Sequence, residues 1–110
     1  MKVYEGIRTK NGCQVTVREQ GATSRPLDPR LDLHNHSPTG FEWGYGGSGP
    51  AQLALALLAD TLGDDDEAHR LHQDFKFKVV GRLPHDRWQM TEEEISGKIA
   101  EIDQSRRSRA

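Results

Sequence analysis

Residues 40–60 read GFEWGYGGSGPAQLALALLAD, and this stretch decides the fold because a string of glycines joins an aromatic run to an apolar helix. Phe41, Trp43 and Tyr45 stand at every second position, so their rings share one face of an extended chain. The residues after Gly49 are apolar almost all round a helix, which is typical of a central helix. We therefore expect the aromatic row to pack on that helix, with Trp43 in the core. Two alternatives stay open for the row: a stacking platform for a planar ligand, and a contact surface for another protein.

The glycines carry a second pattern, because Gly44, Gly46 and Gly49 spell G-x-G-x-x-G directly before the helix. Such a loop can turn its backbone amides toward an anion at the positive end of a helix. A dinucleotide-binding fold is disfavoured because the chain continues into a second helix instead of a parallel strand, and no lysine follows as in a Walker loop. The loop is therefore either a tight structural turn or a weak site for a phosphate or carboxylate. The candidate ligand-binding residues are Trp43, Tyr45, Gly46, Gly47, Ser48 and Gly49.

The residues before this stretch predict a small antiparallel sheet. KVYEGIRT and CQVTVR flank KNG, and an Asn-Gly pair between two β-prone runs is a strong hairpin signal. Residues 19–29 contain two prolines and a glycine and are predicted to be a loop. RLDLH (residues 30–34) and FEWGY (residues 41–45) are extended in character, so they would supply one or two further strands.

Three helices are predicted after the glycines. The first begins near Pro50 and ends at Gly63, and the second follows an acidic run at residues 64–67 and is stopped by Pro84. The third opens at TEEE (residues 91–94), which has the spacing of a capping box. Strands followed by helices indicate an α+β fold, in which a small antiparallel sheet, the N-terminal hairpin plus one or two further strands, packs against about three helices.

Length and charge bound the domain organisation and the partners. Among 110 residues, we expect residues 1–104 to form a single α+β domain and residues 105–110, SRRSRA, to form a basic, flexible tail. A net charge of −2 supplies no strong field to recruit nucleic acid or anionic lipid. The arginines of the tail are the one local candidate for a nucleic-acid contact, and a solvated chain end is the preferred interpretation.

Cysteine content and hydropathy predict the compartment. Cys13 is the single cysteine, which rules out an internal disulfide and a Cys-rich zinc site and fits a reducing cytoplasm. The first ten residues contain no apolar segment typical of a signal peptide, and the apolar run at residues 51–59 is far shorter than the ~20 residues that span a bilayer. We therefore expect a cytoplasmic protein with no membrane partner and a buried, structural thiol.

The histidines form two groups, HNH at residues 34–36 and HRLHQD at residues 69–74. Histidine pairs at such spacing can bind zinc. A solvated helix face is the preferred interpretation of His69 and His72, so we expect no metal site and no cofactor. No Ser-His-Asp or paired-carboxylate arrangement follows from the spacing, and no catalytic residue is assigned.

Two strings, NHSPTGFEWGYGGSGPAQLALALLAD and QDFKFKVVGRLP, resemble a family of small bacterial proteins, also met on mobile elements, that is catalogued as a domain of unknown function. The resemblance extends from about Val3 to Trp88, and the string WGYGGSGP within it is specific. It implies a self-contained bacterial cytoplasmic domain and no particular reaction. REQGATS (residues 18–24) is longer than the short turn expected between those strands.

The sequence predicts a well-defined fold but contains no complete catalytic or metal-binding motif. We therefore expect a non-enzymatic binding or accessory module that acts through protein contacts near the glycine loop. The partner protein and the oligomeric state do not follow from the sequence. The alternative is a small-ligand protein or enzyme that holds a phosphate or carboxylate with residues 44–49 and the following helix N-terminus.

Overall fold

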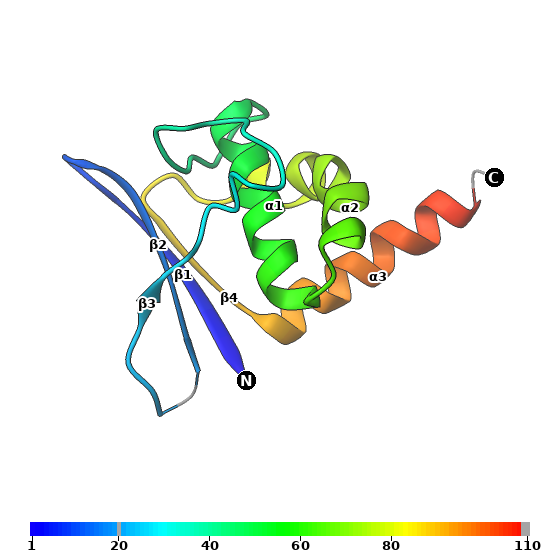
Figure 1. The fold of residues 1–110 in the computed structure, drawn as a ribbon, viewed down its shortest axis with the longest axis horizontal. Helices are drawn as coiled ribbons and strands as arrows, with labels where there is room; N and C mark the ends of the chain where they lie inside the picture. The colour runs from blue at the N-terminus through cyan, green and yellow to red at the C-terminus, as the bar shows by residue number, and fades with distance from the viewer. Residues whose placement is uncertain (20, 109–110) are drawn as a thin grey trace.

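A computed structural model describes residues 1–19 and 21–108, in which a four-stranded antiparallel sheet lies beside three α-helices (Figure 1). The elements are, in chain order, β1 (Lys2–Thr9), β2 (Gly12–Glu19), β3 (Arg25–Pro26), α1 (Ser48–Leu62), α2 (Asp65–Lys78), the 3-10 helix η1 (Val80–Arg82), β4 (Arg87–Thr91) and α3 (Glu92–Ser108). The strand order in the sheet is β3-β2-β1-β4. This arrangement confirms the predicted α+β class. Arg109 and Ala110, at the end of the predicted tail, lie outside the described residues, as does Gln20.

β1 and β2 form the predicted hairpin. Thr9 lies opposite Gly12, which leaves Lys10 and Asn11 as the turn. Gly12 has a φ of 118°, a backbone conformation that favours glycine, so the glycine after the asparagine closes the turn. The inner face of β2 packs on the core through Cys13, Val15 and Val17.

The two remaining strands are not the segments that the sequence pattern favoured. β4 pairs with β1, and the two-residue β3 pairs with β2 from inside the expected loop. RLDLH forms no strand because the chain turns at Arg30, whose φ is 54° and whose carbonyl accepts a hydrogen bond from the Leu33 amide. FEWGY forms none because Gly44 has a φ of 88° and bends the run in its middle.

The indole of Trp88 packs directly on Gly6 within the sheet. The two residues are opposite each other in β4 and β1, and a Cβ atom built at Gly6 would lie 2.3 Å from Cε2 and Nε1 of the indole. Only glycine leaves room for the ring at this position. The Nε1 of Trp88 is buried and has no hydrogen-bond partner among the described residues.

α1 is the central element, and Figure 1 shows it between the sheet and α2. Every residue from 49 to 59 is buried, as expected for a helix that is apolar almost all round. The helix begins at Ser48, slightly earlier than predicted, with Gly47 as its N-cap. Gly63 ends it in the left-handed conformation, at a φ of 64°, and donates its amide to the carbonyl of Ala59.

α2 starts as predicted and ends early. The Asp64 side chain caps the helix by accepting a hydrogen bond of 3.1 Å from the Glu67 amide. The helix stops at Lys78, well before Pro84, and η1 follows. Gly81 of η1 lies against the backbone of Tyr45, where an added Cβ would be 3.2 Å from the Tyr45 carbonyl oxygen. The end of α2 is therefore shaped by close contact with the glycine loop.

α3 opens with the predicted capping box, in which the Glu94 amide donates to the Thr91 hydroxyl over 3.1 Å. The helix continues through Ser108, so the boundary expected after residue 104 falls inside it. Arg106 donates to the carboxylate of Asp74 on α2 over 2.8 Å. Arg106 is therefore held by a partner on a neighbouring helix.

Gln52 connects α1 to the long loop that precedes it. Its side chain is fully buried, and its Oε1 accepts hydrogen bonds from the amides of His36 (2.8 Å) and Ser37 (3.1 Å). Its Nε2 donates to the carbonyl of Pro29 over 2.6 Å. One buried amide thus satisfies three backbone groups and fastens residues 29–37 to the central helix.

We predict that Gln52→Leu lowers the free energy of unfolding by at least ~2 kcal/mol, because each backbone group left buried without a partner costs about 1–3 kcal/mol. Gln89→Leu is the matched control, since Gln89 is exposed on β4, and it should change stability by less than ~0.5 kcal/mol. Urea unfolding followed by circular dichroism measures both. Equal stability of the two variants would show that the loop does not depend on Gln52.

Candidate functional site

A cleft of about 470 Å³ opens between the tip of the hairpin and the glycine loop, and we call it the hairpin cleft. The hairpin contributes Asn11, Gly12 and Cys13 to its wall. The rest of the wall comes from the segment that precedes α1 and from the first turn of that helix: Ser37, Thr39, Gly40, Phe41, Glu42, Tyr45, Ser48 and Gly49. The cleft is therefore lined in large part by residues 40–49, which belong to the stretch that decides the fold.

A second cleft of about 370 Å³, which we call the tryptophan cleft, lies beside the first and shares Glu42 and Tyr45 with it. Its remaining wall consists of Arg8, Trp43, Gly44, Leu83 and His85. Of the candidate residues, Tyr45, Ser48 and Gly49 line the hairpin cleft, and Trp43 and Tyr45 line the tryptophan cleft. Gly46 and Gly47 line neither of the two.

The aromatic row does not form one face. Trp43 is 1% exposed, which confirms its predicted place in the core. Its Nε1 donates to the carbonyl of His85 over 3.0 Å, and its ring meets Trp88 edge-on at 5.6 Å. Phe41 is half-buried, whereas Tyr45 is 53% exposed. The bend at Gly44 separates the third ring from the first two. Aromatic residues at every second position of the sequence therefore do not lie on one face here.

Glu42 dominates the electrostatics of both clefts. Its carboxylate accepts a hydrogen bond from Arg8 over 2.8 Å, and the Arg8 guanidinium also lies over the Trp43 ring at 5.1 Å. Desolvation, the largest single influence, raises the pKa of Glu42, but the hydrogen bonds from Arg8 and Cys13 and the charge of Arg8 together hold that pKa below its usual value. Burial raises the pKa of the neighbouring Cys13 thiol. Cys13 is therefore held in its protonated form and is a poor nucleophile.

Glu42 also lies against the first turn of α1. A Cβ atom built at Gly49 would be 2.6 Å from the Cβ of Glu42 and 3.1 Å from its amide nitrogen. Gly49 thus allows the backbone before the loop to touch the helix. The same contact places an acidic residue beside the helix N-terminus, where a bound anion would be attracted.

Two exposed aromatic rings flank the glycines on the surface. Tyr45 is 53% exposed and Phe77 is 58% exposed. A Cβ at Gly46 would lie 3.2 Å from the Phe77 ring, and a Cβ at Gly47 would lie 2.4 Å from the Tyr45 ring. We call these four residues the aromatic patch. Both rings rest against backbone that carries no side chain. A larger residue at position 47 would displace the Tyr45 ring.

Lys76 borders the aromatic patch. Its Nζ lies 4.0 Å from the centroid of the Phe77 ring, and the side chain as a whole is buried. Within residues 1–19 and 21–108, no carboxylate forms an ion pair with this ammonium. The patch therefore combines apolar rings with an uncompensated positive charge.

Four histidines come together beside α2, which the sequence did not indicate. The ring centroids of His34 and His36 are 4.0 Å apart, those of His36 and His72 are 5.0 Å apart, and those of His69 and His72 are 5.1 Å apart. The expectation of a solvated helix face is wrong for His72, which is 3% exposed. No three His, Cys, Asp or Glu side chains of the described chain are placed so that they could hold a metal ion together.

Burial lowers the pKa of His36 to about 4 and also lowers that of His72. The charges of the neighbouring histidines and of Lys76 act in the same direction. Both imidazoles are therefore neutral near pH 7, so each ring has one nitrogen with a free lone pair.

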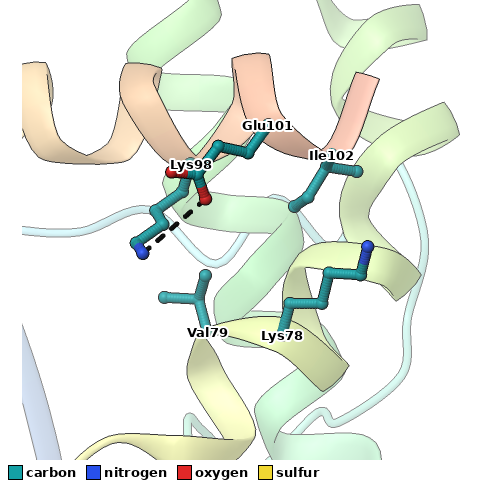
Figure 2. Close-up of a pocket in the computed structure, with 5 residues that line it drawn as sticks. All are labelled: Lys78, Val79, Lys98, Glu101 and Ile102. Carbon is teal, nitrogen blue, oxygen red and sulfur yellow. Dashed lines mark ion pairs between the residues drawn. The ribbon is translucent and has the colours of Figure 1, made fainter. Parts of the chain in front are cut away.

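A smaller pocket of about 110 Å³ lies between the end of α2 and α3 (Figure 2). Lys78 and Val79 approach it from one side, and Lys98, Glu101 and Ile102 of α3 approach it from the other. Lys98 pairs with Glu101 over 3.7 Å, one helical turn away. No candidate residue lines this pocket.

Comparison with known proteins identifies a family but no function. A family model described as a family of unknown function (DUF6166) matches residues 4–101. No curated protein and no solved structure matches the chain. Among the described residues, no helix has the length and apolar character needed to cross a membrane.

We predict opposite effects for two glycine-to-alanine changes in helices. Gly49→Ala should destabilise the protein, because the new methyl group meets Glu42 and overpacking of this kind costs about 1–3 kcal/mol. Gly97→Ala in α3 meets no atom within 4 Å and should stabilise the protein by ~0.5–1 kcal/mol through helix propensity. Urea unfolding of the two variants beside wild type tests this, and a Gly49→Ala variant as stable as Gly97→Ala would contradict the close contact.

Proposed function

Because the chain belongs to this family of unknown function, we propose its function from the geometry of the glycine loop: a non-enzymatic binding module that holds a segment of a partner protein on the aromatic patch. The observation that carries the proposal is the exposure of Tyr45 and Phe77 on either side of Gly46 and Gly47. Aromatic side chains that remain exposed and adjacent are enriched at protein interfaces, where they account for much of the binding energy.

The surroundings of the patch support a segment of particular chemistry. An apolar side chain of the partner would pack between the two rings, above backbone that carries no side chain of its own. A carboxylate next to it would pair with Lys76, whose ammonium lies over Phe77 without an ion-pair partner in the described chain. The proposed ligand is therefore an acidic segment that carries an aromatic or aliphatic residue.

The backbone on both sides of the patch is tied to the rest of the fold. Trp43 is buried next to the exposed Tyr45, and the Gly44 amide donates to the carbonyl of Val80 over 3.0 Å. Phe77 belongs to α2 and is fixed by that helix. A preorganised surface of this kind loses little conformational entropy when a partner binds.

The single cysteine, partly buried, supports the proposal that the module works in a reducing bacterial cytoplasm.

Capture from a lysate of the source cells tests the proposal. A Tyr45→Ala/Phe77→Ala double variant should recover at least tenfold less of a partner than wild type does, since loss of one interface hot spot costs about 2 kcal/mol or more. Ile7→Ala/Leu31→Ala is the matched control, because both side chains are exposed and apolar but lie outside the patch. Quantitative mass spectrometry of the captured proteins, with tag and protein concentrations equalised, gives the ratios.

The proposal also requires that the positive charge of Lys76 contributes to partner binding. A partner that meets the proposal should also be captured less well by Lys76→Gln, and the difference should shrink at high salt. Circular dichroism of each variant confirms that it is folded. Recovery of the same proteins in the same amounts by wild type, patch variant and control would refute a binding role for the patch.

The alternative function is a small-ligand protein or enzyme that holds a phosphate or carboxylate with residues 44–49 and the N-terminus of α1, where Ser48 and Gly49 lie. The hairpin cleft supports it, because both residues line that cleft at the N-terminus of α1. Glu42 opposes it, since its carboxylate lines the same cleft and its one strong cationic neighbour, Arg8, is already paired.

A thermal-shift panel of inorganic phosphate, nucleotides and sugar phosphates separates the two functions. We expect no shift, because the repulsion from Glu42 offsets the attraction of the helix terminus. Saturating binding would instead stabilise the protein by about 2.7 kcal/mol at a hundredfold excess over Kd. A shift of that size that is enlarged in Glu42→Gln would establish the alternative.

A further inference from the structure

His36 and His72 connect the loop that precedes α1 to α2. Their Nε2 atoms are 2.9 Å apart, so one imidazole donates a hydrogen bond to the other. The His72 side chain is 3% exposed, and that of His36 is half-buried. The His36 amide also donates to the Gln52 side chain of α1. His36 therefore fixes the loop to two helices, through its ring and through its backbone.

The neighbours of His72 show which of the two rings donates. Its Nδ1 lies 2.6 Å from the carbonyl oxygen of His69, so this nitrogen carries the proton of the neutral ring. The side-chain amide nitrogen of Gln73, which can only donate, lies 3.4 Å from the Nε2 of His72. The Nε2 of His72 is therefore the acceptor, and the Nε2–H of His36 is the donor.

A proton taken up by either ring acts against this contact. On His72 the proton occupies the accepting lone pair, and two N–H groups then face each other across 2.9 Å. On His36 it adds a positive charge, which is opposed by the charges of His34, His69 and Lys76. The hydrogen bond between the rings is therefore compatible only with two neutral imidazoles.

The elements around the pair offer no negative charge in return. α1 presents the neutral side chain of Gln52 to the loop. Within residues 1–19 and 21–108, no ion pair joins a carboxylate to any of the four clustered histidines. Acidic residues along the loop and α2 pair with arginines instead: Asp32 and Asp65 with Arg30, Glu67 with Arg70, and Asp74 with Arg106.

We propose that the contact between His36 and His72 is an acid-sensitive latch, which holds residues 34–37 on α2 at neutral pH and releases them when the pair takes up a proton. The release alters the hairpin cleft, because Ser37 follows His36 directly and lines the wall of that cleft. Thr39 and Gly40 of the same loop line the wall as well. Acidification therefore loosens the part of the cleft wall that this loop supplies.

The direction of the pH effect follows from burial, the largest influence on both rings. Burial lowers the pKa of His36 from an ordinary value of 6.5 to about 4, and it also lowers the pKa of His72. The released loop regains ordinary pKa values, so it binds more protons than the latched loop does. By linkage, the latched state is fully favoured above about pH 6.5 and loses stability as the pH falls toward about 4.

Amide hydrogen exchange, followed by NMR near pH 7 and near pH 5, tests the latch. The amides of His36 and Ser37 report on it directly, since both donate to Gln52 in the latched loop. Their protection factors, which are corrected for intrinsic exchange at each pH, should fall about twentyfold in wild type, the ratio expected from the pKa shift of His36 alone. The Leu55 amide of α1 should stay at least tenfold better protected at both pH values, because the loop opens without the helix.

His36→Gln keeps a hydrogen-bond donor at this position but removes the titrating ring. The glutamine amide takes up no proton in this pH range, so the fall in protection at Ser37 should be at least fivefold smaller than in wild type. His85→Gln is the matched control, because His85 is exposed and lies outside the four-histidine cluster, and it should behave as wild type does. Circular dichroism at both pH values confirms that each variant is folded.

Two outcomes would overturn the proposal. Unchanged protection of wild type between the two pH values would show that the loop does not respond to protons. An equal fall in wild type and in His36→Gln would assign the response to ordinary acid destabilisation elsewhere in the chain.

Discussion

The side-chain amide of Gln52 is the interaction on which the arrangement of loops around α1 depends. It is the polar exception within the fully buried run of that helix, and its three hydrogen bonds go to backbone groups of residues 29–37. A loop without regular structure cannot lie on an apolar helix unless its amides and carbonyls find partners. By supplying them, Gln52 positions Ser37 in the wall of the hairpin cleft and His36 opposite His72.

The glycine loop and the contact between His36 and His72 are both positioned by the central helix α1. Residues 44–49 begin it and carry the aromatic patch, whereas the loop attached to its side carries His36. α2 contributes to both, with Phe77 at the patch and His72 at the pair, and Lys76 lies between them in sequence. The glycine loop and the histidine cluster are therefore held by the same two helices, although they involve different side chains.

Features with local causes could be predicted from the sequence. The hairpin at Asn11 and Gly12, the end of α1 at Gly63 and the capping box at Thr91 each depend on residues a few positions apart, and each lies where it was expected. Features with distant causes could not be predicted. β4 is a strand because β1 lies beside it, and His72 is buried because a residue 36 positions earlier covers it. Alternation along FEWGY was misleading, because a single glycine with positive φ bends the run, and Tyr45 is exposed although Trp43 is buried.

The indole of Trp88 over Gly6 has an evolutionary consequence. Since the ring occupies the space that any side chain at position 6 would need, the two positions cannot drift independently. A homologous chain with a larger residue in the middle of its first strand must carry a smaller one opposite it in the last strand. If the tryptophan is replaced first, the intermediate sequence is loosely packed at this position, and if the glycine is replaced first, it is overpacked. These two positions should therefore covary across related sequences, as a unit inherited together.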